Sequence, residues 1–334
     1  MGWLIVGAAT LLIVLARLLQ GLAVGGETGI ASVVLMELAP RTHRCYLVSW
    51  RSASQAGAAL AGTLVGAALS ALLSTEQLYD WGWRVPFMLG LLIAPVGWYL
   101  RRHMVEVAAP ARRRVSLRRV IEQQGPALWL GVLLMAAPAS SIYLLVYYMP
   151  TYLVNTLQMP ATLGLLSACV SAVLVLVAAP LFARLADRQR SRKRLQGLTS
   201  VLSIVLVYPL FLALTQGCGE LMSLLIIGVF SVLVMGNNGA VTVLIMEAFA
   251  RHHRATGMTM VYSLGSTLFG GFCPFIVTWL IHVIGDAMAP AWYLLAALSI
   301  SLYALVRFPA AFEPDEAVDK ALPGAWPGSA STPA

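Results

Sequence analysis

Two charged residues lie in the first long apolar segment of the 334-residue sequence and its expected helical continuation to about residue 36. Arg17, Gln20, Val24 and Glu27 follow one another at steps of three and four residues, which places them on one helix face. A charge at membrane depth costs at least about 2.5 kcal/mol, so it usually faces a cavity and serves a function. A guanidinium is also the natural bidentate partner of a carboxylate. We therefore expect Arg17, Gln20 and Glu27 to bind an anionic substrate or carry protons; the alternative is a structural ion pair.

Further hydrogen-bonding side chains interrupt later apolar segments. We expect them to contact carboxylates and hydroxyls in a cavity near the membrane midplane. The alternative for the tyrosines is anchoring at the membrane boundary, where this residue type is common. The candidates are Tyr143, Tyr147, Asn237, Asn238 and Tyr262.

Carboxylates and guanidiniums also gather where apolar segments end. Such groups form alternative sets of contacts at helix–loop junctions, which favours a cytoplasmic gate that opens and closes. The alternative is a solvated charge cluster that only fixes the topology. The candidates are Glu37, Arg41, Arg44, Asp187, Arg188, Glu247, Arg251 and Arg254.

The elements that position these residues are apolar blocks. Hydrophobic residues make up 59% of the chain and charged residues 11%, against about 45–50% and 25% in water-soluble domains. The blocks are continuous and about 20 residues long, the length of a helix that crosses a bilayer. The sequence thus predicts an all-α integral membrane protein with about nine spans. They lie near 3–24, 52–73, 84–101, 127–149, 162–183, 197–215, 221–246, 257–281 and 290–307.

The basic residues indicate which way the chain crosses the membrane. Twenty of the 22 Lys and Arg residues lie on every second loop and on the C-terminal tail. The alternate loops, 74–83, 150–161, 216–220 and 282–289, carry none. Because basic loops stay in the cytoplasm, we expect a cytoplasmic C-terminus. The membrane topology then accounts for the net charge of +8, so we expect no nucleic-acid partner.

Cofactor, metal and enzyme chemistry have little support in the sequence. The four cysteines are widely spaced and form no C-x-x-C pair, so neither a disulfide framework nor a zinc site is predicted. No His, Asp, Glu, Ser and Cys residues converge as an enzyme requires. We therefore expect no enzyme activity, catalytic residue, cofactor or metal.

An internal repeat relates residues 26–44 to residues 236–254. Eight of the 19 aligned positions are identical, including the spacing M-E-x-x-x-R-x-H-R. The copies lie on the first and seventh spans, and internal repeats are typical of secondary transporters. Three spans precede the second copy in its half and none precedes the first, so the nine spans are interpreted as twelve minus three. On the span that carries the first copy, Gly21, Gly25 and Gly29 have the spacing of closely packed membrane helices.

Several motifs resemble the major facilitator superfamily, in particular its metabolite:proton symporters. RLLQGLAVGGETG at 17–29 and LADR at 185–188 look like superfamily motifs. SWRSASQ at 49–55, WGWRVPFMLG at 81–90 and YSLGSTLFGGFCPFIVTWLIHVIGD at 262–286 are similar to citrate–proton symporters. The first three family helices are absent, and Arg51 stands where citrate carriers typically show glutamine.

The resemblance implies a proton-coupled symporter of citrate or a related tricarboxylate, working by alternating access. The alternatives are another metabolite (a dicarboxylate, an aromatic acid or a betaine) or an inactive truncated transporter. We expect a monomer in the bacterial inner membrane, whose partners are a small organic anion, a proton and the lipid bilayer. The predicted parts are an incomplete N-terminal bundle at 1–101, a cytoplasmic linker at 102–126, a six-helix bundle at 127–309 and a flexible tail at 310–334.

Overall fold

The computed structural model of the chain describes residues 2–103, 117–189, 191–236 and 238–308. These residues form helices joined by short turns, with no strand among them. The α-helices are α1 (Gly2–Leu38), α2 (Arg44–Leu72), α3 (Thr75–Asp80), α4 (Val85–Leu91), α5 (Ile93–His103), α6 (Leu117–Leu134), α7 (Ala136–Ile142), α8 (Met149–Thr151), α9 (Ala161–Arg188), α10 (Arg192–Thr215), α11 (Glu220–Gly236), α12 (Asn238–Glu247), α13 (Arg254–Gly265), α14 (Cys273–Ile284) and α15 (Ala289–Arg307). Short 3-10 helices cover Arg41–His43 (η1) and Gly82–Arg84 (η2), and π-helical segments cover Tyr143–Tyr148 (η3), Tyr152–Thr156 (η4) and Ser266–Gly271 (η5).

The helices have the lengths and surfaces of membrane spans. Among the described residues, seven helical segments are long and apolar enough to cross a bilayer. Large apolar side chains such as Leu181, Val205 and Phe275 are exposed on their outer faces, where lipid replaces water as the solvent. The other two predicted spans, 3–24 and 84–101, fall on α1 and on the pair α4 and α5. The prediction of an all-α membrane protein is confirmed.

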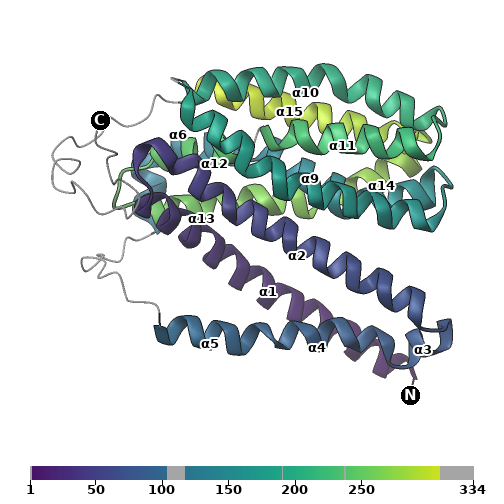
Figure 1. The fold of residues 1–334 in the computed structure, drawn as a ribbon. Helices are drawn as coiled ribbons and strands as arrows, with labels where there is room; N and C mark the ends of the chain where they lie inside the picture. Colours follow the sequence, from purple (N-terminus) through teal and green to yellow (C-terminus); the bar gives the residue numbers. More distant parts are fainter. Residues whose placement is uncertain (1, 104–116, 190, 237, 309–334) are drawn as a thin grey trace, which may run out of the picture.

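Helices α6 to α15 form a bundle whose buried apolar residues gather in two clusters. In Figure 1, α9, α10, α11 and α15 run side by side across the upper part of the molecule. Phe211 of α10 packs in one of the clusters, with ring contacts to Tyr152 and Phe230. These side chains are almost fully buried, so the bundle supplies a rigid wall for any site on its surface.

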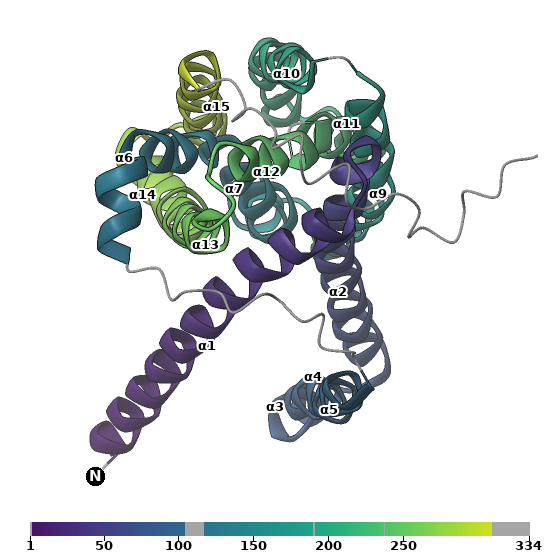
Figure 2. The same ribbon diagram turned by 90° about the vertical axis from the view of Figure 1, so that its left-hand side faces the viewer.

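Helices α1 and α2 contact this bundle chiefly at one end. Helix α1 packs on α13 and α2 packs on α9, and both then diverge from the bundle (Figures 1 and 2). The buried residues of α2 all lie between Cys45 and Ala56, in its first half. We call this end the basic end; here α1, α9 and α12 finish and α2, α10 and α13 begin.

Glycines allow α1 to approach α13 closely. A Cβ atom on Gly25 would lie 2.6 Å from Ser263 Oγ, and one on Gly29 would lie 2.6 Å from Thr259 Cα. Both distances are too short for a real side chain, so only glycine permits this packing. The packing interpretation of these two glycines is confirmed.

Candidate functional site

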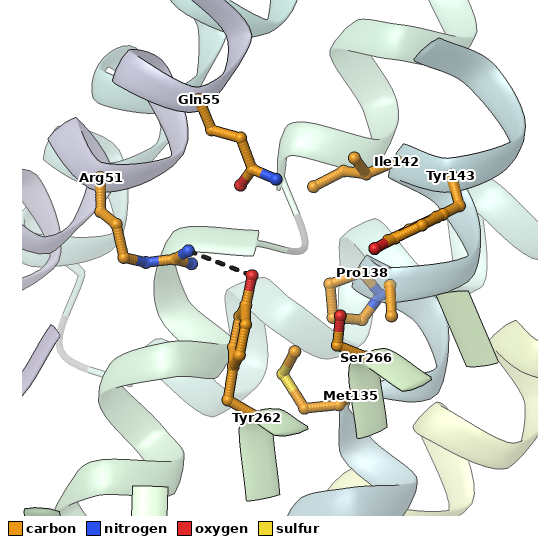
Figure 3. Close-up of a pocket in the computed structure, with 9 residues that line it drawn as sticks. Arg51, Gln55, Met135, Pro138, Ile142, Tyr143, Tyr262 and Ser266 are labelled. Atoms are coloured by element: carbon orange, nitrogen blue, oxygen red, sulfur yellow. Dashed lines mark hydrogen bonds between the residues drawn. The ribbon is translucent and has the colours of Figure 1, made fainter. Parts of the chain in front are cut away.

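A recess lies between α2 and the bundle and is lined by polar side chains from three directions. Arg51 and Gln55 come from α2, and Tyr143 comes from the junction of α7 and η3. Tyr262 lies on α13 and Ser266 begins η5. Figure 3 shows the ends of these side chains pointing toward a common space, and the remaining lining residues are Met135, Pro138, Ala139 and Ile142.

Arg51 provides the positive charge of the recess. Its Nη1 donates to the Tyr262 hydroxyl at 3.5 Å, and its Nη2 donates to Ser52 Oγ at 3.4 Å. Both hydrogen bonds are long and therefore weak. The Nε atom is buried without a hydrogen-bond partner, and among the described residues no carboxylate pairs with Arg51. A guanidinium with unused donors can bind a carboxylate in a bidentate way.

The sequence prediction missed Arg51 because it placed the start of the second span too late. We counted Arg51 among the loop residues, with the span beginning at 52, whereas α2 begins at Arg44. Arg51 therefore lies seven residues inside the helix, about 10 Å from its first residue. The small buried residues Ser49, Ser52 and Ala53 pack here, and such residues weaken the apolar signal on which the boundary rests.

Two of the three predicted tyrosines line this recess, and the third, Tyr147, lies beside it. Tyr143 and Tyr262 line it, and the rings of Tyr143 and Tyr147 lie 5.5 Å apart. Tyr147 faces Gln55 and lies near Tyr262, although 47% of the residue is exposed. Gln55 and Ser266 were missed because single polar residues in apolar helices carry no signal of the direction that they face.

The helices beside the recess change their winding there. Tyr143 begins the π-helical segment η3, and Ser266 begins η5. Such π-helical turns are rare and frequently occur at functional sites. A Cβ atom on Gly270, within η5, would lie 2.6 Å from the Tyr143 ring. The glycine therefore leaves room for this tyrosine beside the recess.

The remaining predicted site residues do not line the recess. Gln20 and Glu27 of α1 are exposed. Because Gly25 and Gly29 face α13, Glu27 lies on the opposite side of the helix, about 200° around its axis. The side chains of Arg17 and Asn238, and the whole of Asn237, lie outside the described part of the structure.

An ionic network joins the ends of several helices at the basic end. Arg192 Nη1 donates to Glu247 Oε1 at 2.7 Å, and its Nη2 donates to Asp187 Oδ1 at 3.3 Å and to the Arg41 carbonyl at 3.0 Å. Arg44 Nη1 donates to the same Glu247 oxygen at 3.4 Å. The network therefore joins the start of α2 to the ends of α9 and α12.

Asp187 adds backbone contacts to the network. Its carboxylate accepts from the amides of Cys45 and Tyr46 at 3.1 and 2.8 Å. These amides belong to the first turn of α2, where donors lack helical partners and the helix dipole favours an anion. The aspartate of α9 therefore caps α2 across the interface.

The predicted gate residues divide into two groups. Arg44, Asp187 and Glu247 meet in the network, while Arg254 donates to the Met246 carbonyl at 2.8 Å and lies near Glu37. The side chains of Glu37, Arg41, Arg188 and Arg251 are exposed. The prediction missed Arg192, because nothing in the basic run 184–194 distinguishes the residue that turns inward.

Comparisons with known proteins agree with this architecture. The profile of the Major Facilitator Superfamily matches residues 1–267. The chain is 32% identical over 302 residues to the citrate-proton symporter of Salmonella typhi, covering 89% of this chain and 69% of the symporter. The citrate-proton symporter of Klebsiella pneumoniae is 33% identical over 301 residues, covering 89% and 68%. A putative proline/betaine transporter of Staphylococcus aureus (strain COL) is 28% identical over 311 residues, covering 90% and 66%.

Proposed function

The chain belongs to the Major Facilitator Superfamily and is a multi-pass membrane transporter, and from this premise we propose that it carries an organic anion such as citrate together with a proton. The substrate would bind in the recess between α2 and the bundle. The protein would act in the bacterial inner membrane, with its C-terminus and its basic end in the cytoplasm. Alternating opening of the two sides of the recess would move the substrate.

The observation that carries the proposal is the guanidinium of Arg51. A charge in a low-dielectric site is unfavourable unless it is paired, and no described carboxylate pairs with Arg51. A substrate carboxylate would supply the missing acceptor. Gln55, Tyr143 and Tyr262 lie around the same space and would hydrogen-bond the other oxygens of a hydroxylated acid.

Tyr262 gives this binding site a link to the cytoplasmic side. Arg51 lies seven residues from the start of α2, and Tyr262 lies eight residues from the start of α13. Both are thus about 10–12 Å from the basic end. A carboxylate on Arg51 would compete with the Tyr262 hydroxyl for the same Nη1 donor. Substrate binding would therefore weaken a contact between α2 and α13.

Glu27 is the proposed proton carrier. It lies 11 residues before the end of α1 at Leu38, about 16 Å along the helix axis. The ionic network of Arg44, Arg192 and Glu247 would form the cytoplasmic gate.

A zwitterion such as a betaine is the second candidate. Arg51 would bind its carboxylate, and the rings of Tyr143, Tyr147 and Tyr262 would face its ammonium group. Aromatic faces attract quaternary ammonium ions. The similarity to a putative proline/betaine transporter gives this candidate independent support.

Binding and uptake by the purified full chain test the proposal. Labelled citrate, succinate and glycine betaine are offered to the protein in proteoliposomes, with and without an imposed proton gradient. Accumulation of citrate only with the gradient supports proton-coupled anion transport. Binding of betaine alone selects the second candidate, equal uptake in both conditions rejects proton coupling, and no binding of any probe rejects the proposed site.

A further inference from the structure

A second recess opens at the basic end, on the outer side of the ionic network. It lies between the start of α2 and the end of α9, and its lining residues are Thr42, His43, Tyr46, Arg184, Asp187 and Arg188. The recess is open to solvent, and its empty volume is ≈ 740 Å³ when that open space is included. The transport mechanism above assigns no role to this space.

The charge balance of this recess is positive. Arg184 and Arg188 contribute two guanidiniums, and His43 adds an imidazole whose Nδ1 lies 2.9 Å from the Thr42 hydroxyl. Asp187 is the one carboxylate of the lining, and its oxygens already accept from two backbone amides and from Arg192. The Asp187 carboxylate therefore already has hydrogen-bond partners, and the two lining arginines favour the binding of an anion.

Arg184 is held in position by an aromatic side chain. Its Nη2 donates to the Tyr46 hydroxyl at 3.0 Å, and its Cζ lies 4.4 Å from the centroid of the Tyr46 ring. Its other nitrogen atoms donate to no residue that the structure describes. A planar guanidinium with free N–H groups suits the bidentate recognition of a phosphate.

Apolar side chains continue from this recess along the membrane face of the same helix. Val173, Val177, Leu181 and Leu185 follow one another at steps of four on α9, and each is 41–57% exposed. Arg184 and Arg188 extend this face to the basic end, since residues three or four apart lie on one side of a helix. The face therefore changes from apolar to cationic along α9.

The start of α2 shows the same change. Trp50 follows Tyr46 by one turn, is 48% exposed and contacts the Tyr46 ring edge-to-face at 6.1 Å. Tryptophan and tyrosine concentrate at the level of lipid headgroups. A cationic recess beside an aromatic pair and an apolar stripe matches an amphiphile, whereas free phosphate would use only the cationic part.

We propose that this recess binds the phosphate headgroup of an anionic phospholipid, with one acyl chain along the exposed stripe of α9. Arg184 and Arg188 bind the phosphate, and Tyr46 holds Arg184 in place. Because Tyr46 also donates its backbone amide to Asp187, the lipid sits against a residue of the interface between α2 and α9.

Native mass spectrometry of the purified full chain with phosphatidylglycerol tests the proposal without any transport measurement. We compare the unmodified chain with the double variant Arg184→Gln/Arg188→Gln. The control is Arg194→Gln/Arg307→Gln, which removes two exposed arginines from the same end. Each basic residue near an anionic lipid contributes about fivefold to binding, so the first variant should retain about 25-fold less lipid.

The control should retain phosphatidylglycerol like the unmodified chain, and phosphatidylcholine should be retained weakly by all three proteins. Equal retention by the two double variants would overturn the site. Complete displacement of the lipid by excess inorganic phosphate would assign the recess to free phosphate instead, because two guanidiniums can bind either kind of phosphate group. Melting temperatures of the variants exclude unfolding as the cause of a loss.

Discussion

Replacement of Arg51 by methionine removes the charge of the recess and keeps an unbranched side chain. In the structure Arg51 makes two weak hydrogen bonds, at 3.5 and 3.4 Å, and its Nε has no partner. The substitution removes these bonds and a cation–π contact, in which the Arg51 Cζ lies 5.1 Å from the centroid of the Tyr262 ring. It also removes a charge that no described carboxylate pairs, which offsets the loss. We expect the melting temperature of Arg51→Met to stay close to that of the unmodified chain.

Substrate binding should respond much more strongly. A hydrogen bond to a charged group contributes about 1.5–3 kcal/mol, which corresponds to about 10- to 150-fold in affinity. We expect Arg51→Met to weaken the binding of labelled citrate by this factor. Arg51→Lys keeps the charge but loses the planar fork, so its affinity should be intermediate.

Equilibrium binding of labelled citrate to purified protein measures this effect. Ser54→Ala is the matched control, because Ser54 lies on the same helix, is exposed and, within the described part of the chain, bonds only to the Arg51 carbonyl. Citrate affinity of Arg51→Met within twofold of the unmodified chain would refute the role of the guanidinium.

Two further predictions concern the contacts around the recess. Gly29→Ala should destabilise the protein by about 1–3 kcal/mol, because its Cβ would lie 2.6 Å from Thr259 Cα, and thermal melting checks this. Arg192→Gln should speed alkylation of the buried Cys45 thiol by a permeant maleimide about tenfold, because loss of a charged hydrogen bond favours opening by about 1.5 kcal/mol.

Matched variants make both results specific. Gly26→Ala places its Cβ in open space, so a loss of stability as large as that of Gly29→Ala would contradict the packing argument. For the thiol experiment, Cys169, Cys218 and Cys273 are replaced by alanine. Arg194→Gln removes an exposed charge from the same end. If Arg194→Gln speeds alkylation of Cys45 as much as Arg192→Gln does, the gate interpretation is wrong.

The fold was predictable because the bilayer imposes a simple pattern. Continuous apolar blocks of about 20 residues form membrane-spanning helices. The seven helical segments that are long and apolar enough to cross a bilayer confirm this prediction. The helix ends were less predictable. The span expected at 127–149 belongs to a segment that begins at Leu117, has a kink at Gln124 and continues through η3 and η4 to Thr156. An apolar count detects neither the polar turns before the kink nor the π-helical turns at the other end.

The site was predictable only in part, because it depends on which helices become neighbours. Tyr143 and Tyr262 were found as polar residues in apolar spans. Arg51 was missed through a helix boundary, and Arg192 because its partners lie on other helices. The contact of Arg192 with Glu247 joins residues 55 positions apart, and no local pattern encodes such a distance.

The central claim is that an organic anion and a proton cross the membrane together through this protein. Citrate added outside proteoliposomes that contain a trapped pH-sensitive dye tests it most directly. We predict that the lumen becomes acidic as labelled citrate enters, and that Arg51→Met and empty liposomes show neither change. Entry of citrate with an unchanged lumenal pH would contradict the account.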